Sequence, residues 1–159
     1  MRLTAGIDVG STYTKTILAD SQGHILARAL EPTGFRLAEV AGSTFERALH
    51  EAGQRREQVA YVVATGYGRH QVPFADLHIT DLTAAARGAA WLYPRTRTIL
   101  DVGGQTMKAT RLGENASVRS FRLNDKCAAG TGAFLEKTAR YMGYTTAEIG
   151  PLVQTSKEA

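Results

Sequence analysis

The chain has 159 residues, of which 43% are hydrophobic and 21% are charged. These values are typical of a folded globular domain and exclude a disordered chain, a collagen-like repeat and a disulfide-rich scaffold. Lys and Arg exceed Asp and Glu by 19 − 15 = 4, and this excess is spread along the chain rather than gathered in a basic run. We therefore expect no nucleic acid partner.

The sequence also predicts a protein that is neither embedded in a membrane nor secreted. Its most apolar stretch, residues 84–93, contains Arg87 and is shorter than the roughly 18 residues that a membrane span needs. Asp8 interrupts the apolar run that a signal peptide would require at the N-terminus. The single cysteine, Cys127, cannot form a disulfide within the chain. We expect a cytoplasmic protein.

Apolar periodicity predicts an alternation of strands and helices. Short apolar or alternating segments indicate strands, and an apolar residue every three or four positions indicates a helix. In the first half we predict strands at 3–9, 13–19, 25–30 and 59–64, and helices at about 35–53 and 81–93. In the second half we predict strands at 98–102, 107–112 and 118–123, a helix at 130–143, and a further helix that begins at the capping box of Thr145 and Glu148.

The second half repeats the order of the first. Asp8 lies in the segment Ile-Asp-Val-Gly and Asp101 in Leu-Asp-Val-Gly, at an offset of 101 − 8 = 93 residues. Each segment ends one predicted strand and leads into another. We therefore predict an α/β chain of two related modules, residues 1–94 and residues 95–159. The second module has fewer elements than the first, so we expect the chain to be a fragment of a longer protein.

The first repeated turn has the residues of a phosphate-binding site. Without a Cβ at Gly10, the main-chain amides of Gly10, Ser11 and Thr12 can approach phosphate oxygens closely. Asp8 can hold a hydrated Mg²⁺ ion, and Lys15 adds positive charge.

The second turn offers the same chemistry through Gly103, Gly104 and Gln105, with Asp101 as the metal-facing carboxylate and Gln105 able to orient a water molecule. The alternative is an ordinary turn in which Asp caps local amides, but a second copy at the same place in the topology argues against it. Neither turn is a P-loop or a dinucleotide fingerprint. Two such turns predict nucleotide binding.

Cys127 lies in a loop of small residues, 124–132, just before a predicted helix and next to Lys126. A helix N-terminus and a neighbouring cation both favour the thiolate form, which binds metals. The alternative is a buried structural cysteine. An iron–sulfur cluster needs about four thiolates, so one cysteine per chain can contribute only across an oligomer.

Four segments together resemble a known family: residues 6–12, 64–69, 101–105 and above all 124–132, which reads Asn-Asp-Lys-Cys-Ala-Ala-Gly-Thr-Gly. They resemble the BadF/BadG/BcrA/BcrD-type ATPases, which are the activators of 2-hydroxyacyl-CoA dehydratases and the ATP-binding subunits of benzoyl-CoA reductases. The turns alone would indicate only the wider superfamily of acetate and sugar kinases, Hsp70 and actin. The cysteine segment is the specific part.

The resemblance implies an actin-like ATPase fold of two RNase H-like modules with ATP between them, the second module here being truncated. It further implies an ATP-hydrolysing, one-electron donor that is a homodimer or a heterodimer of paralogues. One [4Fe-4S] cluster is shared by the dimer, with Cys127 as a ligand and the second ligand cysteine of the family absent from this chain. Asp8 and Asp101 would hold Mg²⁺ through water, and Gln105 would position the attacking water.

The implied partners are the acyl-CoA reductase or dehydratase subunits, with reduced ferredoxin or flavodoxin as the electron donor. The amino-acid sequence of residues 33–39 favours the benzoyl-CoA reductase branch over the dehydratase activators. Three other classes stay open: a small-molecule kinase, an RNase H-like nuclease that uses Asp8, and an actin-like assembly module without redox chemistry. Phosphorylated product, metal-dependent cutting of an RNA–DNA hybrid, or nucleotide-dependent polymer would identify each of them.

Overall fold

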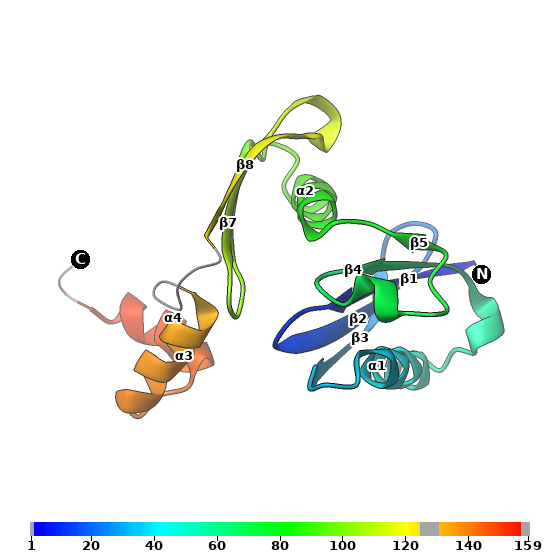
Figure 1. Cartoon of the computed structure of the whole chain (residues 1–159), viewed down its shortest axis with the longest axis horizontal. Coiled ribbons are helices and arrows are strands. Elements are labelled where there is room, and N and C mark those ends of the chain that lie inside the picture. The colour runs from blue at the N-terminus through cyan, green and yellow to red at the C-terminus, as the bar shows by residue number, and fades with distance from the viewer. Residues whose placement is uncertain (1, 125–130, 157–159) are drawn as a thin grey trace. The chain divides into compact units, whose positions relative to one another are not determined.

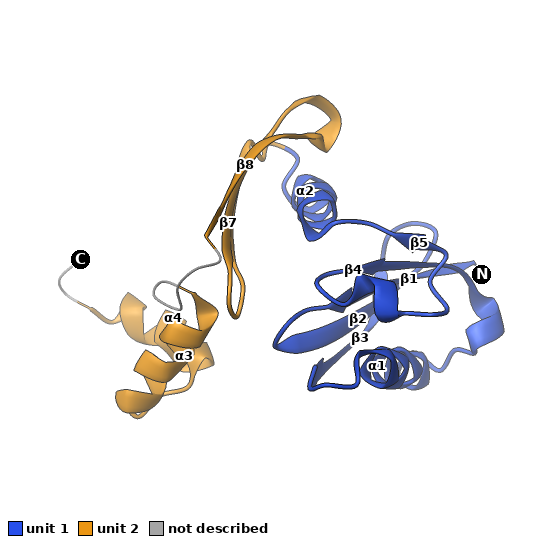
Figure 2. Ribbon diagram, in the orientation of Figure 1, with its two compact units in different colours: residues 1–94 blue, residues 95–159 orange. Residues whose placement is uncertain are grey.

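The computed structural model describes residues 2–124 and 131–156. The chain divides into two compact units, residues 1–94 and residues 95–159, which Figure 2 shows in different colours. Within the described residues, no helix is both long enough and apolar enough to cross a membrane.

Unit 1 contains a five-stranded sheet and two α-helices (Figure 1). Along the chain its elements are β1 (Leu3–Val9), β2 (Tyr13–Ala19), β3 (Ile25–Pro32), α1 (Leu37–Glu51), β4 (Val59–Thr65), β5 (Leu77–His78) and α2 (Asp81–Leu92). The strand order is β3-β2-β1-β4-β5. β1, β2 and β3 form an antiparallel meander, whereas β4 runs parallel to β1 and β5 runs parallel to β4.

The core of unit 1 lies between α1 and one face of this sheet. β1 alternates between buried and more exposed residues, as a strand covered on one face does. Ile7 from β1 and Leu18 from β2 are fully buried, and Phe45 from α1 is 1% exposed. The residues of β1 between the buried ones, Asp8 among them, therefore lie on the opposite face of the sheet.

Unit 2 contains an antiparallel sheet in the order β6-β7-β8 and two helices. Its elements are β6 (Thr98–Val102), β7 (Met107–Leu112), β8 (Val118–Asn124), α3 (Gly132–Tyr141) and α4 (Thr146–Gln154). α3 and α4 pack against each other. Leu100 and Phe121 are 66% and 49% exposed, so apolar side chains of this sheet are open in the described structure.

Most predicted elements are present within two residues of their expected ends. The predicted helix 130–143 is described only from Gly132, with Thr131 as its N-cap, and it ends before Gly143, whose φ of +81° stops it. The predicted capping box of Thr145 and Glu148 is confirmed at the start of α4. The two-residue strand β5 was not predicted, because a pair of residues carries no periodicity.

Candidate functional site

The first repeated turn, residues 10–12, joins β1 to β2 and is called turn 1 here. The amide of Gly10 donates to the carbonyl of Tyr13 over 3.2 Å, which closes the turn. A Cβ on Gly10 would lie 2.8 Å from that carbonyl oxygen, so a side chain cannot be added without displacing the turn. Ser11 at the tip is exposed, and Thr12 is half-buried. The hydrogen bond that closes the turn therefore itself favours glycine at position 10.

Asp8 and Lys15 face each other across β1 and β2, directly below turn 1. Lys15 Nζ lies 2.9 Å from Asp8 Oδ2, and the two side chains are 48% and 37% exposed. An ion pair this exposed contributes little to stability. The structure therefore joins the two charged residues that the sequence assigned separately to metal and phosphate.

The loop after β4 wraps around the end of β1. The amide of Gly68 donates to Val9 O over 2.9 Å, and Arg69 Nη1 donates to the carbonyl of Gly66 over 3.0 Å. Gly66 has a φ of +88°, and a Cβ there would collide with the Asp8 carboxylate and the carbonyl of Val9. The loop thus presses main chain, without a side chain, against the carboxylate of Asp8.

Thr65 adds a polar group that sequence reasoning missed. It is the Cα partner of Asp8 across β1 and β4. Among the described residues its Oγ1 is the buried side-chain atom without a hydrogen-bond partner. The sequence analysis placed Thr65 in the family-like segment 64–69 without giving it a role, and only the register of the strands shows that it lies beside Asp8.

The second repeated turn, residues 103–105, joins β6 to β7 and is called turn 2. It closes in the same way, because Gly103 N donates to Thr106 O over 2.8 Å, and a Cβ on Gly103 would lie 3.1 Å from that oxygen. Gln105 is exposed at the tip. The bonded pairs of the two turns keep the offset of the repeat, since 10 + 93 = 103 and 13 + 93 = 106.

Turn 2 also has the counterpart of the Asp8–Lys15 pair. Asp101 and Lys108 are Cα partners across β6 and β7, and both are half-buried. Sequence reasoning did not single out Lys108, although the offset that pairs the two aspartates gives it directly, because 15 + 93 = 108.

The start of α3 is bonded to turn 2. Gly132 N donates to Gly103 O over 2.8 Å, and Ala133 N donates to Gly104 O over 3.0 Å. A Cβ on Gly132 would lie 3.0 Å from Gly103 O, so a larger residue there would push turn 2 and the start of α3 slightly apart. The helix that follows the cysteine segment is therefore attached to turn 2 by its first amides. Cys127 itself lies outside the described residues.

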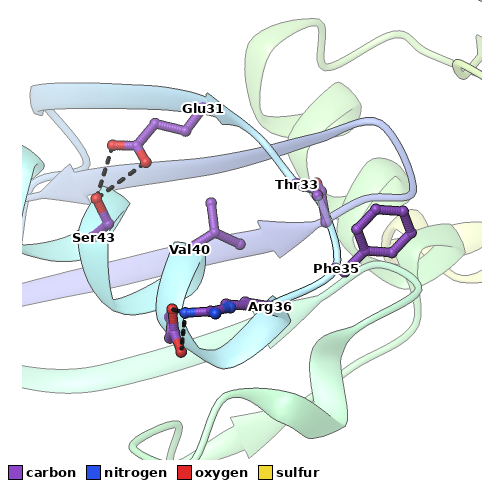
Figure 3. A pocket seen from close by; sticks show the side chains of 8 residues that line it. Glu31, Thr33, Phe35, Arg36, Val40 and Ser43 are labelled. Atoms are coloured by element: carbon purple, nitrogen blue, oxygen red, sulfur yellow. Dashed lines mark hydrogen bonds and ion pairs between the residues drawn. The ribbon is translucent and has the colours of Figure 1, made fainter.

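A hollow of about 480 Å³ lies beside turn 1, between the end of β3 and the start of α1 (Figure 3). Its charged groups are already paired. Arg36 Nη1 lies 3.2 Å from Glu39 Oε2, and Ser43 Oγ donates to both carboxylate oxygens of Glu31 over 3.0 Å. We assign no ligand to it. Among the described residues no three His, Cys, Asp or Glu side chains gather into a metal site.

The sequence model of the BadF/BadG/BcrA/BcrD ATPase family matches residues 5–159. The chain belongs to this family. Its fold is the actin-like ATPase fold that the resemblance implied. The family assignment confirms the one made from the repeated turns and the cysteine segment.

Two curated relatives illustrate the similarity. The activator of lactoyl-CoA dehydratase from Anaerotignum propionicum is 40% identical over 153 residues, which cover 94% of this chain and 57% of that protein. A benzoyl-CoA reductase subunit from Thauera aromatica is 38% identical over 159 residues, covering 96% of this chain and 55% of that protein. The chain thus spans a little over half the length of the relatives it matches.

A solved structure of a dehydratase activator is also similar to this chain. The activator of the 2-hydroxyisocaproyl-CoA dehydratase from Clostridium difficile superposes with a TM-score of 0.88 at 36% identity. The match covers 98% of this chain and 58% of that one.

Proposed function

We propose that the intact protein is an ATP-hydrolysing electron activator that drives one-electron transfer to an acyl-CoA dehydratase or reductase. The observation that carries this proposal is the bonding of turn 2 to the first amides of α3, because it ties a phosphate-binding turn to the helix that follows Cys127. Support for the nucleotide comes from the 36% identical activator whose structure was solved with ADPNP bound.

In this proposal the two turns bind the phosphates of one ATP. The amides of Gly10 and Gly103 close the turns, so the phosphate donors are those of residues 11–12 and 104–105, as in other glycine-rich phosphate sites. Asp8 and Asp101 hold Mg²⁺ through water molecules, and Lys15 moves from the Asp8 carboxylate to phosphate as the metal binds. Gln105, exposed at the tip of turn 2, positions the attacking water.

Cys127 is the proposed iron ligand of this chain. A [4Fe-4S] cluster takes about four thiolates. In this proposal two intact chains, as a homodimer or a paralogue heterodimer, share one cluster, and each gives Cys127 and a second cysteine that the present sequence does not contain. When bound, the cluster supplies a low-potential electron, received from reduced ferredoxin or flavodoxin. The chain's own part is mechanical: any change in turn 2 on loss of the γ-phosphate reaches α3 through Gly132 and Ala133.

The branch within the family is proposed from the relatives. The amino-acid sequence of residues 33–39 favoured benzoyl-CoA reductase. The benzoyl-CoA reductase subunit, however, is 38% identical to this chain, against 40% for the activator of lactoyl-CoA dehydratase. The identities therefore do not support that preference. We propose activation of a 2-hydroxyacyl-CoA dehydratase as the first activity to assay and benzoyl-CoA reduction as the second.

The first experiment measures iron and acid-labile sulfide in the intact protein after anaerobic purification, alongside Cys127→Ser. We expect about four irons per dimer, lost in the variant while ATP binding persists. No iron in either protein, with ATP turnover intact, would overturn the redox proposal and favour a kinase or an actin-like module.

A further inference from the structure

Thr33 is hydrogen-bonded to both ends of turn 1. It follows the last residue of β3 and is 3% exposed (Figure 3). Its amide donates to Thr12 O over 3.0 Å, and its Oγ1 donates to Gly10 O over 2.8 Å. One residue outside the turn therefore fixes two of the turn's carbonyl groups.

The direction of the hydroxyl is set by a second buried threonine. Thr14 Oγ1 lies 2.9 Å from Thr33 Oγ1, and Thr14 is fully buried. Because a hydroxyl has one hydrogen and that of Thr33 goes to Gly10 O, Thr14 must be the donor in this contact. The resulting series of hydrogen bonds runs from the Thr14 hydroxyl to the Thr33 hydroxyl and on to the carbonyl of Gly10.

Fixing these carbonyls also aims the amides of the turn. In a planar trans peptide the C=O and the N–H point in opposite directions. Holding Gly10 O toward Thr33 therefore directs the N–H of Ser11 away from Thr33. Holding Thr12 O does the same for the N–H of Tyr13.

The second module anchors the equivalent carbonyl. Gly103 is the counterpart of Gly10 at the offset of 93 residues, and Gly103 O accepts from Gly132 N over 2.8 Å. Gly132 lies at the start of the helix after β8, just as Thr33 lies between β3 and α1. Both modules thus fix the same carbonyl from the segment that follows their third strand, although one uses a side chain and the other an amide.

We propose that Thr33 is a positioning residue that presets the amides of turn 1 for phosphate. This inference rests on the proposed nucleotide-binding role of turn 1. It predicts that ATP binding weakens when the Thr33 hydroxyl is removed, although in this proposal that hydroxyl does not itself contact the nucleotide.

The chain offers a matched control in a second pair of buried threonines. Thr16 Oγ1 donates to Thr44 Oγ1 over 2.9 Å, and Thr44 Oγ1 donates to Val40 O over 3.0 Å. This series of hydrogen bonds has the same chemistry and burial as the one through Thr33, but it ends at a carbonyl inside α1. Thr44→Val therefore reproduces the structural cost of Thr33→Val away from the turn.

The test measures the Kd for ATP and the unfolding midpoint of the intact protein and its variants. We expect Thr33→Val to raise the Kd about tenfold and Thr44→Val to change it less than about twofold, with similar losses of stability, because each leaves one buried hydroxyl unpaired. Thr33→Ser, which keeps the hydroxyl, should bind ATP within about threefold of the wild type.

Equal Kd values for Thr33→Val, Thr44→Val and the wild type would overturn the positioning role while leaving nucleotide binding intact. If the wild type itself does not bind ATP, the proposed function fails, and the role of Thr33 fails with it. Should Thr33→Val not fold, Thr14→Val removes only the hydroxyl that orients Thr33. It should raise the Kd by about threefold, and an unchanged Kd would count against the proposal.

Discussion

Asp8 meets three different neighbours at once: the ammonium group of Lys15, the main chain of Gly66, and Thr65 as its cross-strand partner. A bare carboxylate at a strand end would bind a cation wherever one was available. Here the carboxylate already has one in Lys15, so Mg²⁺ has to displace or share that partner. This competition makes a metal-free Asp8 a paired residue rather than a vacant ligand.

A different aspartate, Asp20, gives a prediction about pH. The ring of His24, with Nδ1 3.0 Å from Asp20 Oδ2, lowers the pKa of the Asp20 carboxyl below its ordinary value of 3.8, and the amides of His24 and Gln22 add to the effect. A lowered folded-state pKa stabilises the protein above the unfolded value, and this stabilisation is lost as the pH falls through the folded pKa.

We expect Asp20→Asn to lower the free energy of unfolding while the Asp20 carboxyl is ionised, and the difference to shrink as the pH falls below the ordinary value of that carboxyl's pKa. Urea unfolding between neutral and acid pH measures it, with exposed Glu57→Gln as the control. A difference that stays constant down to the acid end would show that the Asp20 charge has no part in stability.

At the scale of the structural elements, the conformation of the loop after β4 depends on a single glycine, Gly66. Gly66 combines a left-handed conformation with contact to the Asp8 carboxylate, so it is constrained twice. Gly53, which follows α1, has a similar φ of +61° but no atom within 4 Å of an added Cβ. Comparing substitutions at the two glycines therefore separates the cost of backbone strain from the cost of a steric clash.

We expect Gly53→Ala to cost about 1 kcal/mol, the strain of a left-handed alanine, and to leave ATP turnover unchanged. Gly66→Ala should cost about 2 kcal/mol or more and lower ATP turnover at least about tenfold, because its Cβ displaces Asp8. Chemical unfolding and an ATPase assay on both variants test this. Equal turnover in the two would mean that the position of Asp8 does not matter for hydrolysis.

The strands and helices were largely predictable, because apolar residues recur at every second position in most strands and at every third or fourth position in the helices. Both turns followed from the repeated Asp-Val-Gly. The sequence singled out segment 64–69, but the roles of Thr65 and Gly66, like that of Thr33, were not predictable, since these residues act through atoms brought together by sheet register and loop packing. Lys108 is the exception, because the repeat offset alone would have found it.

At the scale of the whole molecule, the repeat covers more than two glycine turns. It includes the closing hydrogen bond of each turn, the Asp–Lys pair across each hairpin and the anchored carbonyl of each first glycine. Such agreement supports the proposal that each module carries its own phosphate-binding turn. The proposed activity asks both devices to act on one nucleotide.

This requirement has a thermodynamic signature. We expect Asp8→Asn and Asp101→Asn each to lower ATP hydrolysis about 100-fold, and the double variant to lose far less than the product of the two, because groups that serve one bound metal are not additive. Single-turnover hydrolysis in the intact proteins measures this coupling. Losses that simply multiply would mean that the turns act independently.

The two carbonyl anchors give the halves of the protein different freedom to vary. Turn 1 is held by a hydroxyl, so one codon change at Thr33 is enough to retune it, and natural variants or an engineer could adjust its affinity by small steps. Turn 2 is held by the main-chain amides of Gly132 and Ala133, so no loss of a side chain removes these bonds, whereas a side chain added at Gly132 or a shift of α3 disturbs them. Turn 1 can thus be adjusted by removing one hydroxyl, whereas turn 2 changes when α3 moves or is crowded.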